Sequence, residues 1–243
     1  MGSSIPLQSK KGRYRKHKRP TLSLELFLNG KNNSFASAIV VWETCNLLAQ
    51  RQSLPWQTDE NEVLFYERQV KQGKGILRFW IGDSRDQGGD IQPLKQSEAE
   101  RAIANLDIRA ACLHLIYAAC ATGCDQSWKN EFVISDRQIE QYLGLDKRKD
   151  LSKLDKLSLI NDLSLQACSI IASIRWPRQG RVPEFVTEQE PIWHMVAIHQ
   201  HFETDDLGCK HLTGLTFRIK AGSWAKHFLN QKDHLQHTAF YQY

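Results

Sequence analysis

Lysine and arginine gather between residues 137 and 156, where side chains that can bind phosphate are closely spaced. The segment 147–156, KRKDLSKLDK, holds five Lys or Arg and two aspartates. Ammonium and guanidinium groups neutralise phosphate oxygens, so this spacing is typical of a surface that grips a nucleic-acid backbone. The residues predicted to contact nucleic acid in this region are Arg137, Lys147, Arg148, Lys149, Ser152, Lys153 and Lys156.

A second group of cations lies in residues 1–20, which we interpret as a basic flexible arm. Residues 10–19, KKGRYRKHKR, hold seven Lys or Arg and no acid. An arm of this kind can neutralise phosphates, although a solubilising tail has the same composition. The arm residues predicted to bind nucleic acid are Lys10, Lys11, Arg13, Arg15, Lys16, Lys18 and Arg19.

A third group has the residue types of a metal site: His194, His199, His201, Cys209 and His211. On a strand, His199 and His201 would point to one face, a spacing that can chelate a divalent ion. With Tyr241 or Tyr243 as nucleophile, such a strand would suit a metal-dependent DNA-nicking enzyme. Gln200 stands where that kind of enzyme has a bulky apolar residue, and histidines of a surface strand give the same pattern. We therefore predict neither a metal nor a cofactor.

Helix signals position the first group of cations. Ser135 and Gln138 form an S-x-x-Q capping box at the start of a short helix. Gly144 suits the end of that helix, because glycine takes the left-handed conformation at little cost. A short helix, a glycine turn and a longer basic helix are the outline of a helix-turn-helix.

The second, basic helix is expected to begin near Lys147. Two stripes of side chains would follow from this start, with Lys149, Lys153 and Lys156 on one face and Leu151, Leu154 and Leu157 on the other. Lysine binds phosphate more than it reads base edges. The helix therefore predicts affinity for a backbone better than recognition of one DNA sequence.

Three further helices and a hairpin are expected before this region. A helix from Ser34 has a predicted buried stripe of Ala38, Val41, Trp42, Cys45 and Leu48. Residues 62–70 and 75–83 flank a turn at 71–74 and predict a β-hairpin. A helix capped by Ser97 and a helix over 107–122 that ends at Gly123 come next. The second of these has a predicted core stripe of Ile108, Cys112, Leu115 and Ala119.

Extended segments follow the basic helix. Residues 168–176 and 192–202 predict strands, and 178–185 predicts a turn or wing carrying Arg178 and Arg181, both expected to contact nucleic acid. Leu215, Phe217 and Ile219 alternate with polar residues, which is the clearest strand pattern in the chain. Ser223 is expected to begin a last helix.

This order of elements resembles that of winged-helix DNA-binding domains, in particular those of plasmid-type replication initiators. The resemblance covers roughly residues 106–229 and rests on FVISDRQIEQYLG and LTFRIKAGSWAKHFL together with the element order. It implies that the basic helix enters the major groove and that a hairpin contacts the backbone. The expected fold is α+β, with a basic arm at 1–20, an N-terminal α+β region at 21–95 and a winged helix at 96–243.

Composition limits the classes of function. The 243 residues are 41% hydrophobic and 24% charged, with a net charge of +5, which is ordinary for a chain that buries a core. No apolar run reaches the about 18–20 residues of a membrane span, and no Walker, G-x-S-x-G or H-E-x-x-H motif suggests an enzyme. We expect a cytoplasmic, non-enzymatic protein that binds double-stranded DNA in replication initiation or transcriptional regulation, with a homodimer as one form. The alternative is a subunit of a nucleoprotein assembly that holds RNA or protein.

Overall fold

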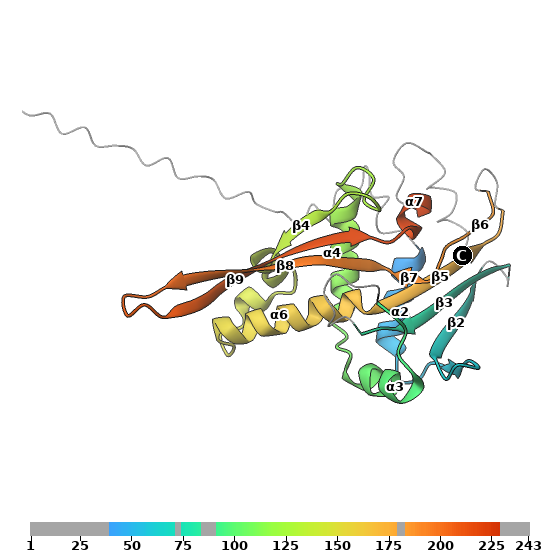
Figure 1. Ribbon diagram of the computed structural model, residues 1–243, viewed down its shortest axis with the longest axis horizontal. Helices are drawn as coiled ribbons and strands as arrows, with labels where there is room; N and C mark the ends of the chain where they lie inside the picture. The colour runs from blue at the N-terminus through green and yellow to red at the C-terminus, as the bar shows by residue number, and fades with distance from the viewer. Residues whose placement is uncertain (1–38, 71–73, 84–90, 179–182, 229–243) are drawn as a thin grey trace, which may run out of the picture.

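The computed structural model describes residues 39–70, 74–83, 91–178 and 183–228. These residues form six α-helices, a short 3-10 helix and two antiparallel sheets, so the predicted α+β class is confirmed. Figure 1 shows a long hairpin and a long helix reaching toward one end of the longest axis, with the larger sheet toward the other end.

The larger sheet has the strand order β1-β2-β3-β5-β6, with β7 also paired to β5. Its strands are β1 Gln57–Thr58, β2 Leu64–Val70, β3 Gly75–Ile81, β5 Ile170–Trp176, β6 Phe185–Val186 and β7 Glu190–Pro191. β2 and β3 confirm the predicted hairpin, with Phe65 opposite Trp80; residues 71–73 of its turn lie outside the described residues. β5 pairs with β3, so a strand from residues 170–176 completes a sheet begun in the first third of the chain. The domain boundary after residue 95 stays a prediction.

The smaller sheet has three strands in the order β4-β9-β8. They are β4 Phe132–Ser135, β8 Trp193–Thr204 and β9 Lys210–Ala221. The predicted alternation on β9 is confirmed, because Leu215, Phe217 and Ile219 have at most 3% of their surface exposed. β4 lies beside β9 with Ile134 opposite Phe217, which places both side chains in the core.

The helices are α2 Ile39–Gln50, α3 Gln96–Asn105, α4 Ala110–Thr122, α5 Asp136–Tyr142, α6 Lys153–Cys168 and α7 Trp224–Phe228, with the 3-10 helix η2 at Leu145–Lys147. α4 contacts both α2 and α6 and ends at Gly123 as predicted. Its predicted core stripe is correct only in part: Leu115 and Ala119 pack against the core, but Ile108 precedes the helix and Cys112 is exposed, whereas His114 and Tyr117 are fully buried. Helix neighbours enclose α4 on more than one side, so apolar periodicity could not identify the buried face.

A buried histidine ties α4 to the base of the long hairpin. The indole Nε1 of Trp193, the first residue of β8, donates a hydrogen bond of 2.9 Å to His114 Nδ1. The Trp193 ring meets Tyr117 and Trp224 edge-on, at centroid distances of 5.8 and 5.3 Å. Complete burial lowers the pKa of His114 to about 3, so the imidazole is neutral in the folded protein.

The remaining predictions for helices are partly correct. The predicted start of the first helix at Ser34 lies outside the described residues, and within α2 Val41 and Leu48 are buried as expected. Trp42 is 43% exposed, so its predicted place in the core is wrong. α3 has Lys95 rather than Ser97 at its N-cap.

Within the described ranges, no single helix has the length and apolar character needed to cross a bilayer; α3 and α4 meet that test of length and composition only as a pair bent by 88°.

Candidate nucleic-acid interface

Hydrogen bonds hold the start of α5 to the end of β4 and to β9. The Ser135 hydroxyl accepts a bond of 3.4 Å from Gln138 N, and Gln138 Oε1 accepts one of 3.0 Å from Ser135 N, so the predicted capping box is confirmed. Asp136 is buried, and its Oδ1 accepts a bond of 3.0 Å from the Leu215 amide of β9. The helix is therefore anchored to the sheet from its first turn.

The connection between α5 and α6 is longer than the sequence pattern suggests. Gly144 has a φ of 68°, as expected for the residue that ends α5. The predicted start of the second helix near Lys147 is wrong: η2 comes first, and α6 begins at Lys153. A second capping box sets this start, because the Ser152 hydroxyl accepts from Asp155 N at 3.1 Å and Asp155 Oδ2 accepts from Ser152 N at 3.1 Å. The S-x-x-D spacing in the sequence is the signal for it.

This later start redistributes the predicted cations. Lys149 precedes α6, so the predicted stripe of Lys149, Lys153 and Lys156 on one helix face is wrong. Lys147, Arg148 and Lys149 instead belong to η2 and to the connection that follows it.

Four of the predicted cations are exposed and make no ion pair within the described part of the chain; we call them the helical surface: Arg137, Lys147, Lys149 and Lys153. Arg148 is instead occupied by Asp150, through bonds of 2.7 and 2.5 Å, and these bonds lower the pKa of Asp150 to about 2. Lys156 Nζ lies 2.8 Å from Glu140 Oε1 and is mostly shielded from solvent. Arg148 and Lys156 are thus each paired with a neighbouring carboxylate, and their predicted contacts with phosphate stay predictions.

One polar and one apolar side chain at the start of α6 also differ from what the sequence predicts. The Ser152 hydroxyl is used in the cap, where it donates to Asp155 Oδ2 and accepts from the Asp155 amide, and its predicted contact with nucleic acid stays a prediction. Leu157 is buried as expected, but Leu154 is 61% exposed, so its predicted place on the apolar side is wrong. With α6 beginning at Lys153, the buried face is made by Leu157, Ile160, Leu163, Ser164, Ala167 and Cys168.

The hairpin beside the helices is β8–β9, and its distal residues 203–211, the hairpin tip, are all exposed. The tip carries Glu203, Asp205, Asp206 and Lys210, so acids outnumber cations there. Asp205 orders the turn: its Oδ1 accepts from the Leu207 and Cys209 amides at 2.9 and 2.8 Å, and its Oδ2 lies 2.7 Å from His211 Nε2.

The predicted wing at residues 178–185 is not this hairpin. Arg178 is exposed and follows β5, where the chain turns toward β6 in the larger sheet. Arg181 lies outside the described residues. The structure therefore does not bring Arg178 to the helical surface. The place of this turn depends on contacts between distant parts of the chain, because β5 pairs with β3 and not with β8.

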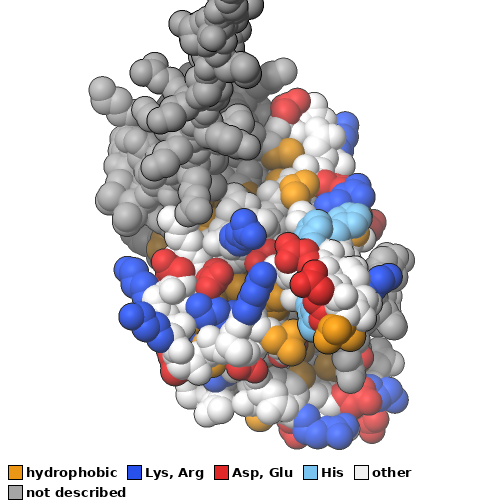
Figure 2. Space-filling model, turned by 90° about the vertical axis from the view of Figure 1, so that its left-hand side faces the viewer, with side chains coloured by type: hydrophobic (Ala, Val, Ile, Leu, Met, Phe, Trp, Pro, Cys, Tyr) orange, Lys and Arg blue, Asp and Glu red, His pale blue; other side chains and the backbone are white. Residues whose placement is uncertain are grey.

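Figure 2 views the end of the molecule toward which the hairpin and the start of α6 extend. Lysine and arginine side chains lie there beside aspartate and glutamate, with hydrophobic side chains between them. The face is mixed rather than uniformly basic. Whether it can bind phosphates would therefore depend on where the unpaired cations lie rather than on the net charge of the face. The arm residues 10–19 lie outside the described residues.

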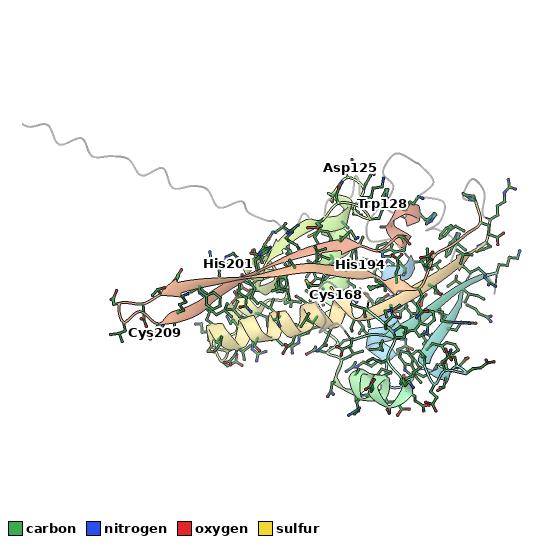
Figure 3. All side chains as sticks on the ribbon, viewed as in Figure 1. Asp125, Trp128, Cys168, His194, His201 and Cys209 are labelled. Atoms are coloured by element: carbon green, nitrogen blue, oxygen red, sulfur yellow. The ribbon has the colours of Figure 1, made fainter. Side chains whose placement is uncertain are left out.

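The candidate metal ligands are spread along the hairpin, as Figure 3 shows for His194, His201 and Cys209. His201 Nε2 is hydrogen-bonded to Thr216 Oγ1 at 2.8 Å, and His211 contacts Asp205. Within the described residues, no group of three or more His, Cys, Asp or Glu side chains could hold a metal ion. The chelating set considered from the sequence is therefore not brought together; Tyr241 and Tyr243 lie outside the described residues.

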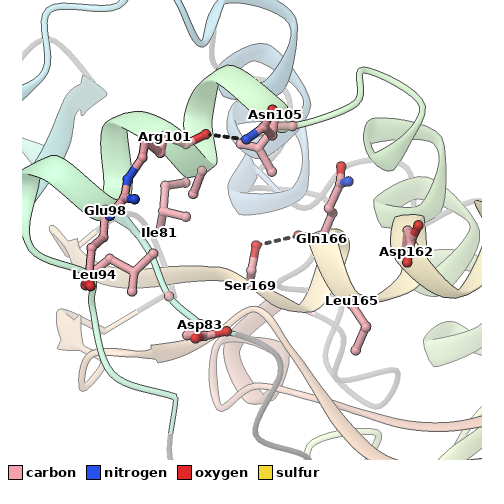
Figure 4. A pocket seen from close by; sticks show the side chains of 13 residues that line it. Ile81, Asp83, Leu94, Glu98, Arg101, Asn105, Asp162, Leu165, Gln166 and Ser169 are labelled. Atoms are coloured by element: carbon pink, nitrogen blue, oxygen red, sulfur yellow. Dashed lines mark hydrogen bonds between the residues drawn. The ribbon is translucent and has the colours of Figure 1, made fainter.

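A cavity of about 580 Å³ lies between β3, α3 and the second half of α6 (Figure 4). Its lining combines apolar and charged side chains, including Glu98, Arg101 and Asp162. Several polar groups are already bonded within their own segments: Asn105 Nδ2 donates to the Arg101 carbonyl at 2.9 Å and Ser169 Oγ to the Gln166 carbonyl at 2.8 Å. No local pattern in the sequence indicates this cavity, because its walls come from segments far apart in the chain.

No protein-family model, no curated protein and no solved structure matches the chain.

Proposed function

We propose that the chain is a DNA-binding protein and that α4, β4, α5, α6, β8 and β9 form a winged helix. Two observations support the architecture. The elements follow the order helix, short strand, two-helix turn and hairpin, and the short strand β4 pairs with the second strand of the hairpin. The chain departs from a minimal winged helix in one respect, because β5, β6 and β7 are inserted between α6 and β8 and join the larger sheet.

The observation that carries the proposal is the helical surface. Arg137, Lys147, Lys149 and Lys153 are exposed and make no ion pair among the described residues, while nearby Arg148 and Lys156 are neutralised by acids. Cations left without internal partners can exchange their counterions for phosphates, which is the main source of affinity in DNA binding. In this proposal the first turns of α6 face the major groove, and the four cations hold the flanking phosphates.

The protein would act without catalysis, in replication initiation or transcriptional regulation, and would be cytoplasmic; a second copy of the chain is a candidate partner. Residues 10–19 would add a further sequence-independent contact with phosphates. The hairpin would flank the DNA without clamping its backbone, because Glu203, Asp205 and Asp206 would repel phosphates.

The test measures binding of fluorescent duplex DNA to the full chain over a series of salt concentrations. The variant Arg137→Gln/Lys147→Gln/Lys149→Gln/Lys153→Gln should reduce the slope of log affinity against log salt by up to about 3.6, about 0.9 for each phosphate contact removed. A matched control, Lys74→Gln/Lys95→Gln/Arg101→Gln/Arg175→Gln, removes four exposed cations from the larger sheet and the α3 region and should leave the slope unchanged. The arm is intact in every protein, so the difference isolates the helical surface. Equal slopes for wild type and the fourfold variant would refute the proposal.

One observation favours the second candidate, a subunit of a larger nucleoprotein assembly. The hairpin exposes 52% of Phe202 and 89% of Leu207 among acidic neighbours, which suits binding to a basic, partly apolar protein surface better than binding to DNA. This candidate predicts that the protein purifies with RNA or with another protein, and that Leu207→Ser abolishes this association while binding of duplex DNA is unchanged.

A further inference from the structure

Leu154 lies at an unusual place for a large apolar side chain. It is the second residue of α6 and is 61% exposed, whereas Leu157 and Ile160 on the same helix are 2% and 1% exposed. A leucine in water contributes little to folding, because the hydrophobic effect rewards only surface removed from water. Single exposed leucines are common, so the chemistry around this one must decide whether it has a role.

The polar side chains near Leu154 are already engaged. Ser152 and Asp155 bond to each other's amides in the capping box, and their side chains also bond at 2.6 Å. Lys156 is held by Glu140. In the first two turns of α6 these contacts leave few groups that could meet a base.

The remaining exposed groups differ in how well they could distinguish bases. Lys153 has no acceptor and favours phosphate. Ser158, one turn beyond Leu154 and exposed, can donate or accept and so discriminates weakly between bases. Leu154 is apolar, and the major groove offers one apolar group on its base edges, the C5 methyl of thymine.

We propose that Leu154 contacts a thymine C5 methyl in the major groove and makes an A·T pair the preferred pair at that position. The inference rests on the proposed function, since it requires that the start of α6 faces DNA. It adds a source of sequence preference to a surface whose cations mainly hold the backbone. The ligand chemistry is narrow: a methyl group on a pyrimidine edge, absent from uracil and cytosine.

The test removes the methyl group and the leucine separately and then together. Duplexes that the full-length wild type selects from a random library are remade with uracil in place of one thymine at a time. At one position uracil should weaken wild-type binding about fourfold, the effect of leaving one methyl group unburied. Leu154→Ala should bind the thymine duplex more weakly by a similar factor and lose the response to uracil at that position. Leu207→Ala, which removes another exposed leucine, should keep the response.

The outcomes separate the inference from the proposed function. Duplex binding with no uracil-sensitive position, or with equal sensitivity in wild type and Leu154→Ala, overturns the role of Leu154 and leaves DNA binding intact. A wild type that selects and binds no duplex overturns the proposed function and this inference with it. Circular dichroism of Leu154→Ala checks that the exposed substitution has not unfolded α6.

Discussion

The helical surface and the hairpin tip extend toward the same end of the molecule but differ in how their charges are used. The four cations of the helical surface have no ion-pair partner among the described residues, whereas the hairpin tip carries mostly acids. Asp205 of the tip is engaged with His211 and with two amides of the turn. Fixed charges of opposite sign on neighbouring surfaces orient a polyanion. In the proposed function, DNA would therefore meet the helices, and the hairpin would limit where the DNA backbone can run.

The two regions are joined by one buried contact between α4 and β8, and the response of this contact to acid gives the largest expected effect on stability. Trp193 at the base of β8 donates to His114 of α4, whose Nε2 is buried and has no hydrogen-bond partner among the described residues. Folding holds the pKa of His114 at about 3, compared with 6.5 in an unfolded chain. Above pH 6.5 this difference has no effect on stability, and each pH unit from 6.5 down to about 3 lowers the free energy of unfolding by about 1.4 kcal/mol. At pH 4 the loss of stability should reach about 3 kcal/mol.

Urea unfolding at pH 7 and pH 4 measures this loss, and His114→Gln is the matched variant. Glutamine cannot take up the proton, so the variant should lose about 3 kcal/mol less than wild type between the two pH values, whatever its stability at pH 7. Tryptophan fluorescence and helical circular dichroism should report one transition if the two regions unfold together. Equal losses in the two proteins would show that other groups cause the acid sensitivity.

Local patterns in the sequence predict the parts of the interface that depend on near neighbours. The Ser135–Gln138 box, the left-handed Gly144 and the alternation of β9 each involve residues a few positions apart, and all three are confirmed. The predicted start of α6 is wrong because a 3-10 turn and an S-x-x-D cap intervene after Gly144. With the later start, Leu154 lies at the surface and not on the buried face.

Non-local contacts account for the remaining errors. Glu140, one helix away, neutralises Lys156, and no periodicity within α6 could indicate that pair. The sequence around Arg178 resembles a wing because β5 and β6 do pair on either side of it, yet β5 also pairs with β3, which places this turn in the larger sheet and not beside the helices. Charge counts from sequence therefore overstate how many cations are available, and pairing of strands decides which hairpin lies beside the helices.

A substitution that disturbs the helical surface but not the hairpin tip should have an effect of intermediate size on stability and on DNA binding. Ser152→Ala removes the hydroxyl that caps α6 and should lower the free energy of unfolding by about 1 kcal/mol. It should also weaken duplex binding, because Lys153 and Leu154 lie on the turn that the cap holds. Urea unfolding and fluorescence anisotropy measure the two effects. Ser152→Thr keeps a capping hydroxyl and should recover most of both, and Ser158→Ala, one turn further along, should leave stability nearly unchanged. Threonine behaving like alanine would mean that the cap does not set the start of the helix.

The smallest effect tests whether the hairpin tip repels DNA. Asp206 is exposed and makes no ion pair within the described residues, whereas Asp205 is needed for the turn. Asp206→Asn should therefore raise duplex affinity by less than about threefold at low salt, and the gain should vanish when salt screens the surface. Glu184→Gln removes an exposed acid beside β6 in the larger sheet and should change affinity less, because it lies away from the helical surface. Weaker binding by Asp206→Asn would contradict the expectation that the hairpin tip repels DNA, because the tip would then contribute a contact with DNA that its charge alone does not predict.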